Sequence, residues 1–583
     1  MSSATATASL FEALLLGLTP AMPLILASAL LGKSTRALVI RLAPWATLPA
    51  LIAAGVASSV LLDMPWLLLG GRLGVDETGR VFLFLTSVLW LLAGIYARYY
   101  LADDKRIARF FAYYLLTMSG NLGLIVAQDA LVFYSFFVLM SLSSYGLIVH
   151  RQDGRALRAG RIYIYLFVLG EVLLFSGLVI GVRHAGTLDL NQFQESIQSD
   201  LVIALLFVGF GIKAGALPLH SWLPLAHTAA PTPASAVLSG AMINAGLLGW
   251  LRFLPMGHMA LPEWSVVCIS AGLGAAIYGV FVGLSQDQPK TVLAYSSISQ
   301  MGLMTFALGI GMAAPVLWPL CLAAILLYGL HHALAKGALF LGAGVAAAAG
   351  KGTLQRKWVL AGLLLPALAI SSLPFTSGAV AKLGLKSLTH ILPEAWSGWM
   401  ALLLSLITVG TSLLMIRFLY LVWFEGSERS RLPPGLWLPW AALLANVALC
   451  TWLWPGAQDA ALQTLSAAAF WQALWPAGAA AMIARAAWIW SRRPGARVTW
   501  HIPPGDILIL GEYLAKQLEL AWSQPAHRLF QRIREKGQHW RRSLTILVPD
   551  PDSATEYWLQ RWEMSGVLIV IIVITITIML ALA

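Results

Sequence analysis

Apolar residues recur along the chain in runs of about twenty, and short polar segments separate the runs. A run of this length matches a helix that crosses the hydrocarbon core of a bilayer. Windows of this size predict about sixteen membrane spans and hence an all-α polytopic membrane protein. The predicted spans lie near residues 8–31, 38–62, 79–97, 108–127, 129–149, 160–181, 201–219, 235–254, 264–284, 292–312, 316–346, 358–389, 398–423, 435–455, 471–490 and 564–583.

The composition agrees with this class. Of the 583 residues, 59% are hydrophobic and only 11% are charged, which is typical of a membrane protein. A net charge of +12 does not indicate nucleic-acid binding here, because the basic residues lie in short loops between spans. Cys268, Cys321 and Cys450 each lie in an apolar run, without disulfide or metal-ligand spacing. We therefore expect them to pack, and we expect no metal site.

Charge alternates from loop to loop, which predicts the orientation of the chain. Basic residues cluster after the odd-numbered spans, at positions 33–36, 105–109, 151–158, 290, 351–357 and 429–431. Acidic residues dominate the opposite loops, at positions 63–77, 189–195, 263, 394 and 459. Since cytoplasmic loops carry the excess of Lys and Arg, both termini are predicted on the periplasmic side of a bacterial inner membrane. The first span has no basic residue before it, so we expect a retained helix and not a cleaved signal.

Two stretches do not read as spans. Residues 64–80 turn through Gly70-Gly71 and predict a short hairpin over the outer face. Residues 505–548 place apolar side chains at helical spacing and basic side chains opposite them. This pattern predicts a lateral amphipathic helix along the cytoplasmic surface, kinked at Pro525, before the final span at 564–583. The alternative for 505–548 is a basic linker that binds anionic lipid, and the two uses are compatible.

One lysine interrupts the seventh span. Lys213 stands between Gly211 and Gly215, and Pro218 breaks the helix soon afterwards. A charge inside an apolar run usually faces a bundle interior or a wet cavity, where a lysine can load and release a proton. The alternative is a lysine that extends to the headgroups, because the loop is only about two turns away. Interior placement is the rule for such residues, so we favour a proton-carrying role.

The combination of a lysine and a helix break recurs five spans later. The stretch 371–378 combines Ser, Pro and Gly and breaks the twelfth span, and Lys382 and Lys386 follow it. Five is an odd number, so two five-span units would have opposite topology. Paired broken helices in inverted halves point to an ion path. The predicted parts are residues 1–107 (spans 1–3 with the hairpin), 108–254 (first inverted repeat), 264–423 (second inverted repeat), 435–490 (C-terminal spans), 505–548 (lateral helix) and 564–583 (final span).

Long composite motifs carry a resemblance to a known family. They are DALVFYSFFVLMSLSSY (129–145), KAGALPLHSWLPLAHTAAPTPASAVLSG (213–240), QDQPKTVLAYSSISQMGLM (286–304), LHHALAKGALFLGAG (330–344) and SLPFTSGAVAK (372–382). The chain resembles the antiporter-like, proton-translocating subunits of respiratory complex I, Mrp antiporters and membrane-bound hydrogenases. In layout it is most similar to the distal antiporter-like subunit of complex I, although its lateral helix is shorter.

The resemblance implies an acid–lysine pair in the first half. The lysine is Lys213, and the family's glutamate in the fifth span is replaced here by Val138. Glu171 in the sixth span matches an aspartate of some members, so it is the remaining candidate. Its alternative, a solvated acid at a helix end, is disfavoured because apolar residues flank it on both sides.

The bridge between the halves departs from the family pattern. Asn244 stands in the eighth span where many relatives carry a lysine or histidine. An amide does not titrate, so it can pass a proton only by orienting water. His220, seven residues after Lys213, is expected either to help the transfer or to cap the broken helix, and the two alternatives stand equal.

The second half supplies the remaining candidates. His332 and Lys336 lie four residues apart on one helix face, and His331 precedes them. A lone intramembrane histidine is often only hydrogen-bonded, but a His–Lys pair in an apolar helix is costly without a task. Lys382 occupies the position of the family's terminal lysine or glutamate. Lys386, one turn on, is expected to reach the interface.

These residues predict a proton-translocating subunit of a larger membrane complex, driven by partner subunits. No cysteine cluster or dinucleotide fingerprint is present in the sequence, so we expect no cofactor. The expected partners are other membrane subunits, including antiporter-like neighbours contacted by the lateral helix, with soluble redox subunits indirectly, and lipid, but no nucleic acid. The alternatives are an Mrp-type sodium/proton antiporter subunit, an inorganic-carbon uptake subunit, or a non-conducting spacer.

Overall fold

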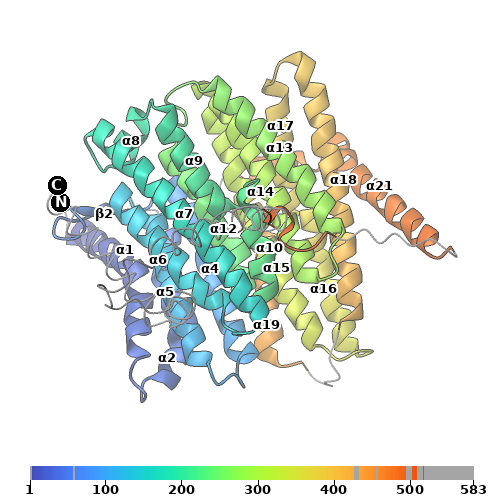
Figure 1. The fold of residues 1–583 in the computed structure, drawn as a ribbon, viewed down its shortest axis with the longest axis horizontal. Helices are drawn as coiled ribbons and strands as arrows, with labels where there is room; N and C mark the ends of the chain where they lie inside the picture. Colours follow the sequence, from blue (N-terminus) through green and yellow to red (C-terminus); the bar gives the residue numbers. More distant parts are fainter. Residues whose placement is uncertain are drawn as a thin grey trace, which may run out of the picture. The chain divides into compact units, whose positions relative to one another are not determined.

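The fold is seen in a computed structural model, and it is helical almost throughout (Figure 1). The described residues are 3–56, 60–425, 432–454, 457–493, 502–508 and 517. Most of the predicted lateral helix at 505–548 and all of the final span at 564–583 lie outside them, so both stay predictions. The chain from its start to Leu508 forms one compact unit, and everything below concerns that unit.

The first part of the chain builds the helices up to the predicted bridge. Their bounds are α1 Ser3–Ala29, α2 Arg36–Leu42, α3 Leu48–Gly55, α4 Glu77–Tyr100, α5 Ile107–Val126, α6 Ala130–Ile148, α7 Gly154–Ala185, α8 Leu190–Ser196, α9 Asp200–Ala214, α10 Trp222–Ala229, α11 Thr232–Val237 and α12 Ile243–Phe253. Three short helical segments, η1 Ala43–Thr47, η2 Leu219–Ser221 and η3 Leu238–Met242, join some of them, and η3 is a π-helix.

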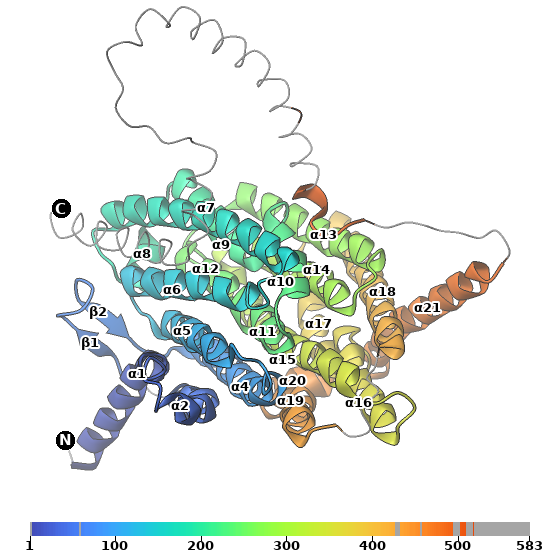
Figure 2. The ribbon, with the colours of Figure 1, turned by 60° about the horizontal axis from the view of Figure 1, so that its bottom comes forward.

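The second part continues in the same way. Its helices are α13 Pro262–Leu284, α14 Pro289–Ala313, α15 Trp318–Ala348, α16 Leu354–Ile370, α17 Ser377–Ser387, α18 Glu394–Phe424, α19 Pro434–Leu453, α20 Gln458–Gln463 and α21 Ala467–Ser491, with the short segments η4 Pro315–Leu317 and η5 Leu388–Ile391. In Figure 2, α21 reaches away from the other labelled helices, with which it shares mainly the contact to α18.

The helices confirm the class predicted from the apolar runs. Each predicted span up to 471–490 coincides with a helix or with a broken helix. Within the described residues, 12 helices are long and apolar enough to cross a membrane, and Pro434–Leu449 is a shorter apolar helix. The total of sixteen spans and the inverted relation of the two repeats stay predictions.

The centre of the molecule is formed by helices that reach no lipid. The apolar windows of Thr232–Phe253 and Pro289–Ala313 are 100% buried, whereas that of Gly154–Ala185 is 33% buried. Helices α13 and α14 approach closely, since a Cβ built at Gly302 would lie 2.5 Å from the carbonyl oxygen of Gly272. Only glycine permits this approach, as in other membrane helix pairs. The polar residues described below lie on or beside these central helices.

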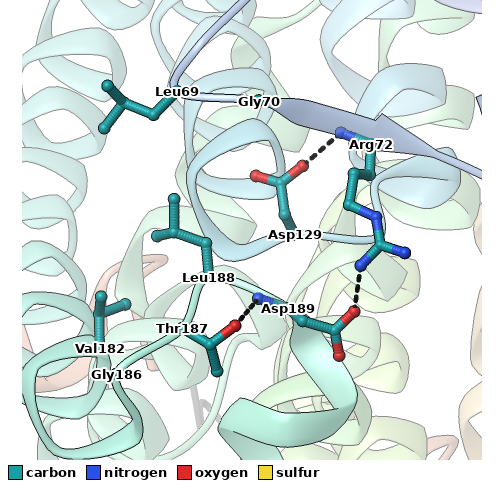
Figure 3. A pocket seen from close by; sticks show the side chains of 9 residues that line it. All are labelled: Leu69, Gly70, Arg72, Asp129, Val182, Gly186, Thr187, Leu188 and Asp189. Carbon is teal, nitrogen blue, oxygen red and sulfur yellow. Dashed lines mark hydrogen bonds and ion pairs between the residues drawn. The ribbon is translucent and has the colours of Figure 1, made fainter. Parts of the chain in front are cut away.

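A hairpin lies near the predicted position, whereas its place over the outer face stays a prediction. Strands β1 (Leu62–Met64) and β2 (Gly71–Leu73) pair antiparallel, and α4 begins at Glu77. Figure 3 shows how β2 is held: the backbone N–H of Arg72 donates to Asp129 at 2.8 Å, and its guanidinium pairs with Asp189 at 2.6 Å. These contacts border a pocket of about 390 Å³. The pocket contains none of the predicted proton-pathway residues, so we assign it no part in the site.

Candidate functional site

The seventh span is broken where the sequence predicts it. Helix α9 ends at Ala214, and Gly215 takes the left-handed conformation with a φ of 70°. The break leaves backbone carbonyls without their helical partners. The indole N–H of Trp222 donates to one of them, the carbonyl of Ile212, at 2.7 Å. Irregular backbone at membrane depth is tolerated only where protein or water satisfies it. The break therefore holds Lys213, the penultimate residue of α9, at a fixed position inside the bundle.

Lys213 is fully buried, so the interior placement predicted for it is correct. Its ammonium donates to the hydroxyl of Tyr163 on α7 at 3.1 Å and lies 4.3 Å from the ring centroid of Phe167. Tyr163 in turn donates to the backbone carbonyl of Ser141 on α6 at 3.0 Å. An ammonium against aromatic faces is stabilised by cation–π attraction, but it keeps few hydrogen bonds. Lys213 is thus stabilised as an ammonium but can still release its proton.

Glu171 lies on α7 and faces the same space. Both of its carboxylate oxygens are buried, and neither has a hydrogen-bond partner within the described chain. The carboxylate is within electrostatic range of the Lys213 ammonium and close to the hydroxyl of Ser141. The structure therefore brings together the acid and the lysine that the sequence paired. A buried carboxylate without hydrogen bonds depends on its opposite charge, which couples the two groups tightly.

Asn244 stands where the first half meets the second. It follows directly on the π-helix Leu238–Met242, and its amide N–H donates to the carbonyl of Gly240 at 2.7 Å. Its Oδ1 is buried and has no partner among the residues that the structure describes. A Cβ built at Gly329 on α15 would lie 4.0 Å from this oxygen, so the oxygen faces the second half. π-Helical turns of this kind are frequent at functional sites.

Helix α15 carries the next three candidates, and all are buried. The ammonium of Lys336 donates to the carbonyl of Leu293 on α14 at 2.9 Å. His331 shares a hydrogen bond of 2.8 Å with the hydroxyl of Ser377, the first residue of α17. Both ring nitrogens of His332 lack a partner in the described ranges. His331 thus links α15 to the second helix break. The two ring nitrogens of His332, by contrast, remain available to accept or donate a proton.

The second break places Lys382 in the interior. Between α16 and α17, Ser372 and Phe375 have φ values of 59° and 64°, which are unusual for residues other than glycine. Strained backbone of this kind collects at functional sites. Lys382 is 4% exposed, and its ammonium has no hydrogen-bond partner within the described residues. It is within electrostatic range of His331 and Lys386.

The sequence analysis missed two further groups, the buried His227 and the half-buried Lys290. His227 on α10 stacks on Phe340 at 4.6 Å between ring centroids, and neither ring nitrogen has a partner in the part of the chain described. Lys290, at the start of α14, donates to the carbonyl of Ala230 at 2.8 Å. His227 interacts electrostatically with both Lys290 and Lys336. Both residues lie in the motifs LAHTAAP and DQPKTV, but a lysine at the start of a span resembles an ordinary loop cation.

His220 differs from the other candidates in its partner, which is an acid from far along the chain. It is fully buried in η2, directly after the break, and its Nε2 is 3.4 Å from the carboxylate of Asp506. The sequence offered two roles for His220, transfer or capping, and neither included this acid. The site as a whole is a series of titratable groups that are buried or half-buried in the bundle: Glu171, Lys213, His220, His227, Lys290, His331, His332, Lys336 and Lys382. Such groups can exchange protons.

The sequence of the chain is similar to those of known proteins. Residues 127–419 match the family described as NADH:quinone oxidoreductase/Mrp antiporter, TM. The chain is 31% identical over 387 residues to hydrogenase-4 component B of Escherichia coli, covering 61% of this chain and 58% of that one. It is 31% identical over 383 residues to NAD(P)H-quinone oxidoreductase subunit 5 of the Paulinella chromatophora chromatophore, covering 61% and 56%.

The fold is shared as well. A chain in the structure of the Mrp complex from a Dietzia species has a TM-score of 0.67 at 20% identity, with 79% of this chain and 98% of that chain covered. The chain spans less than two thirds of the length of the curated relatives named above. The family match extends from the end of α5 through α18 and contains every candidate named above except Asp506. The chain therefore belongs to the transmembrane family of NADH:quinone oxidoreductase and Mrp antiporter subunits.

Proposed function

We propose that the chain is a proton-translocating antiporter-like subunit of a multi-subunit membrane complex. The observation that carries this proposal is the series of buried titratable groups, from the Glu171–Lys213 pair through α15 to Lys382. Residues of this kind within membrane helices are costly and mark ion and proton paths. The relatives in hydrogenase, quinone oxidoreductase and Mrp systems support the same conclusion.

The mechanism is electrostatic. Two opposite charges near each other in a bundle interior each stabilise the ionised form of the other. An ionised Glu171 therefore favours the ammonium form of Lys213, and loss of that pairing favours release of the proton. Tyr163 provides the hydroxyl that holds Lys213 in either state. The proton then crosses by Asn244 and its water to His332 and Lys336.

The exit runs through the second break. Lys336 and Lys382 both lie within electrostatic range of His331. Two ammonium groups beside one imidazole repel each other, so a proton that arrives on Lys336 favours release from Lys382. The neutral amide of Asn244 transfers no charge of its own. It orients the water that links the two halves, as its unpartnered Oδ1 permits.

The energy must come from partners, because the chain supplies only groups that hold and pass protons. We propose that these partners are membrane subunits, some of them antiporter-like, with the segment 505–548 as the contact. Soluble redox subunits would act indirectly. We place the complex in a bacterial inner membrane with both chain termini on the periplasmic side, as the loop charges predict.

Proton uptake into vesicles tests this function. The intact complex that contains the chain is reconstituted, and a potassium diffusion potential set by valinomycin drives the protons, which an internal pH dye reports. The proposal predicts uptake in buffer without sodium. An absolute requirement for sodium would instead favour a sodium/proton antiporter. An intact complex that takes up no protons above empty vesicles would favour a spacer.

A further inference from the structure

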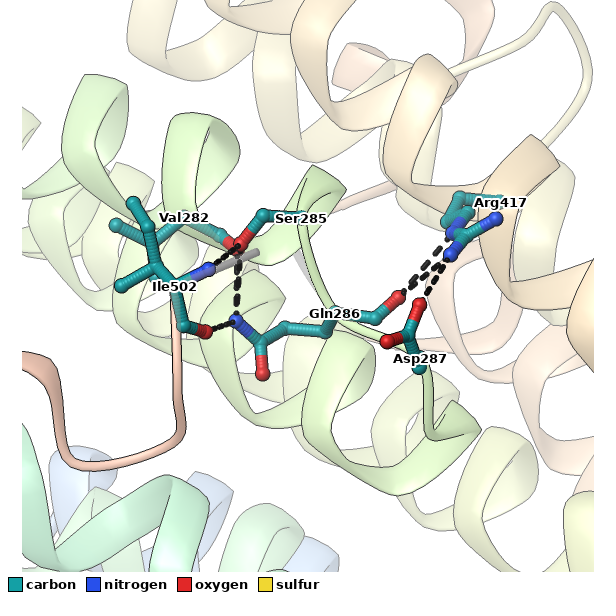
Figure 4. A network of polar contacts seen from close by, with 6 residues as sticks. All are labelled: Val282, Ser285, Gln286, Asp287, Arg417 and Ile502. Carbon is teal, nitrogen blue, oxygen red and sulfur yellow. Dashed lines mark hydrogen bonds and ion pairs between the residues drawn. The ribbon is translucent and has the colours of Figure 1, made fainter. Parts of the chain in front are cut away.

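A segment that follows the helical bundle in the sequence is fixed to it. Residues 502–508 are held at one end by the C-terminal end of α13 (Figure 4). The side-chain amide of Gln286 donates to the carbonyl of Ile502 at 2.7 Å, and the N–H of Ile502 donates to the hydroxyl of Ser285 at 3.3 Å. The backbone carbonyl of Gln286 accepts from Arg417, which also pairs with Asp287 at 2.9 Å. The anchor is therefore built from several connected contacts.

The segment then turns inward. Gly505 has a φ of 92°, a conformation that other residues rarely adopt. A Cβ at this position would also lie 3.3 Å from the side chain of Leu225 on α10. The turn lets the chain approach the bundle closely, and it directs the next side chain, Asp506, between the two halves.

Asp506 reaches three side chains from three elements. Its carboxylate accepts from the hydroxyl of Tyr278 on α13 at 2.5 Å and from that of Tyr295 on α14 at 2.9 Å. The third partner is Nε2 of His220 at 3.4 Å. The Asp506 side chain is only 5% exposed, and that of His220 is 0% exposed. Burial would raise the pKa of Asp506, but His220 and Tyr278 outweigh it, so the pKa lies below its usual value.

The other ring nitrogen of His220, Nδ1, is buried against protein but makes no hydrogen bond within the described residues. A carboxylate on one ring nitrogen fixes the proton there and leaves the other nitrogen as an acceptor. The geometry points to Asp506 as a positioning residue that makes His220 a further proton-loading site at the first helix break. This inference rests on the proposed proton-translocating function and adds a site contributed by the C-terminal segment.

The proton balance needs no other reactant. A proton that reaches Nδ1 converts the neutral imidazole into an imidazolium, whose Nε2–H still faces the carboxylate. The ion pair stores one proton, and the same proton leaves from Nδ1 when a stronger acceptor is available. Tyr278 and Tyr295 keep the carboxylate ionised by donating to it. The Arg417–Asp287 pair belongs to the Ile502 anchor, and Leu225 contributes only apolar atoms.

The test compares Asp506→Asn with Asp63→Asn, whose side chain is 65% exposed, in the intact complex. Proton uptake into vesicles is measured over a range of pH under a fixed potential. Asp506→Asn removes the charge but keeps the shape, so Nε2 of His220 loses its carboxylate partner. We expect about tenfold lower uptake near neutral pH and a profile displaced by about one pH unit towards acid. Asp506→Glu should return the profile towards that of the wild type, and Asp63→Asn should leave it unchanged.

A second readout separates this inference from the function on which it rests. Thermal unfolding of the complex is measured for Asp506→Asn, His220→Gln and the double variant. Non-additive losses of stability establish the contact without reference to transport. If that coupling is present but the pH profile of Asp506→Asn does not move, Asp506 is only structural and the inference is wrong. If the coupling is present and the wild-type complex takes up no protons, the proposed function fails instead. Additive losses overturn the contact itself.

Discussion

The ammonium of Lys213 donates to the hydroxyl of Tyr163, 3.1 Å away, inside a helical bundle in which both side chains are fully buried. The hydroxyl also donates to the carbonyl of Ser141, so it connects the lysine of α9 to the backbone of α6. Glu171 lies on the same helix as Tyr163, eight residues later. The lysine is thus placed between a hydroxyl that orients it and a carboxylate that sets its charge.

Tyr163→Phe tests the orienting role. The ring stays, but the ammonium loses its hydrogen bond, and such bonds to charged groups are worth about 1.5–3 kcal/mol. We expect proton uptake to fall about tenfold or more, with normal assembly. Tyr165→Phe on the same helix is the matched control, because Tyr165 is 70% exposed. Equal uptake in the two variants would show that the hydroxyl of Tyr163 is dispensable.

The contact of Asp76 with Arg252 predicts a pH-dependent stability. Asp76 precedes α4, and its two oxygens each lie 2.7 Å from the guanidinium of Arg252 on α12. The side chain of Asp76 is 44% exposed, whereas that of Arg252 is only 7% exposed. Desolvation would raise the pKa of Asp76, but Arg252 outweighs it and lowers the pKa. The ionised carboxylate therefore stabilises the folded state above the unfolded pKa of about 4, and this stabilisation is lost as the pH falls through the lower folded value.

Asp76→Asn should accordingly lower the melting temperature by a few degrees near neutral pH, and the difference from wild type should shrink at acidic pH. Asp63→Asn is the control, because its side chain is 65% exposed in the pair with Arg72, and exposed pairs contribute little. Thermal unfolding of the purified complex at several pH values checks both variants. A deficit of Asp76→Asn that grows on acidification would contradict this account.

Asn244 distinguishes a conducting path from a dry interface. If its Oδ1 orients water between the halves, Asn244→Ala should slow uptake without adding a new pH dependence. Asn244→Lys should be tolerated, because water and His332 can hydrate the ammonium, which in a dry span would cost a few kcal/mol. Asn446→Ala is a matched control, since Asn446 makes a similar hydrogen bond to the carbonyl four residues earlier but is exposed.

Uptake and assembly yield are measured for all three variants. Unchanged uptake in Asn244→Ala, together with failed assembly of Asn244→Lys, would identify the chain as a spacer. A new titrating step in Asn244→Lys would show that the site lies on the proton path.

The sequence predicts the helices and the charged residues of the interior, for a simple physical reason. A span must be long and apolar, so a lysine such as Lys213 or Lys382 within one is conspicuous. Tyr163 and His227 are not, because aromatic and histidine side chains are ordinary members of a helical core. Their roles depend on what faces them across the bundle.

The contact between His220 and Asp506 was equally beyond the reach of sequence patterns. The two residues are 286 positions apart, and the spacing of neither one indicates the other. Asp506 also lies at the start of the amphipathic stretch predicted at 505–548. An acid in such a stretch is expected on the solvated face of the helix. Only the turn at Gly505 brings it into the interior.

The central claim, proton transfer that begins at the Glu171–Lys213 pair, is tested most directly by proton uptake in Glu171→Gln. Glutamine keeps the size of the side chain but removes the charge that favours the ammonium of Lys213. Glu263→Gln, at the exposed start of α13, is the control for loss of one acid. The account predicts that the Glu171→Gln complex assembles in normal yield and takes up no protons above empty vesicles. Uptake at the wild-type rate in that variant would contradict it.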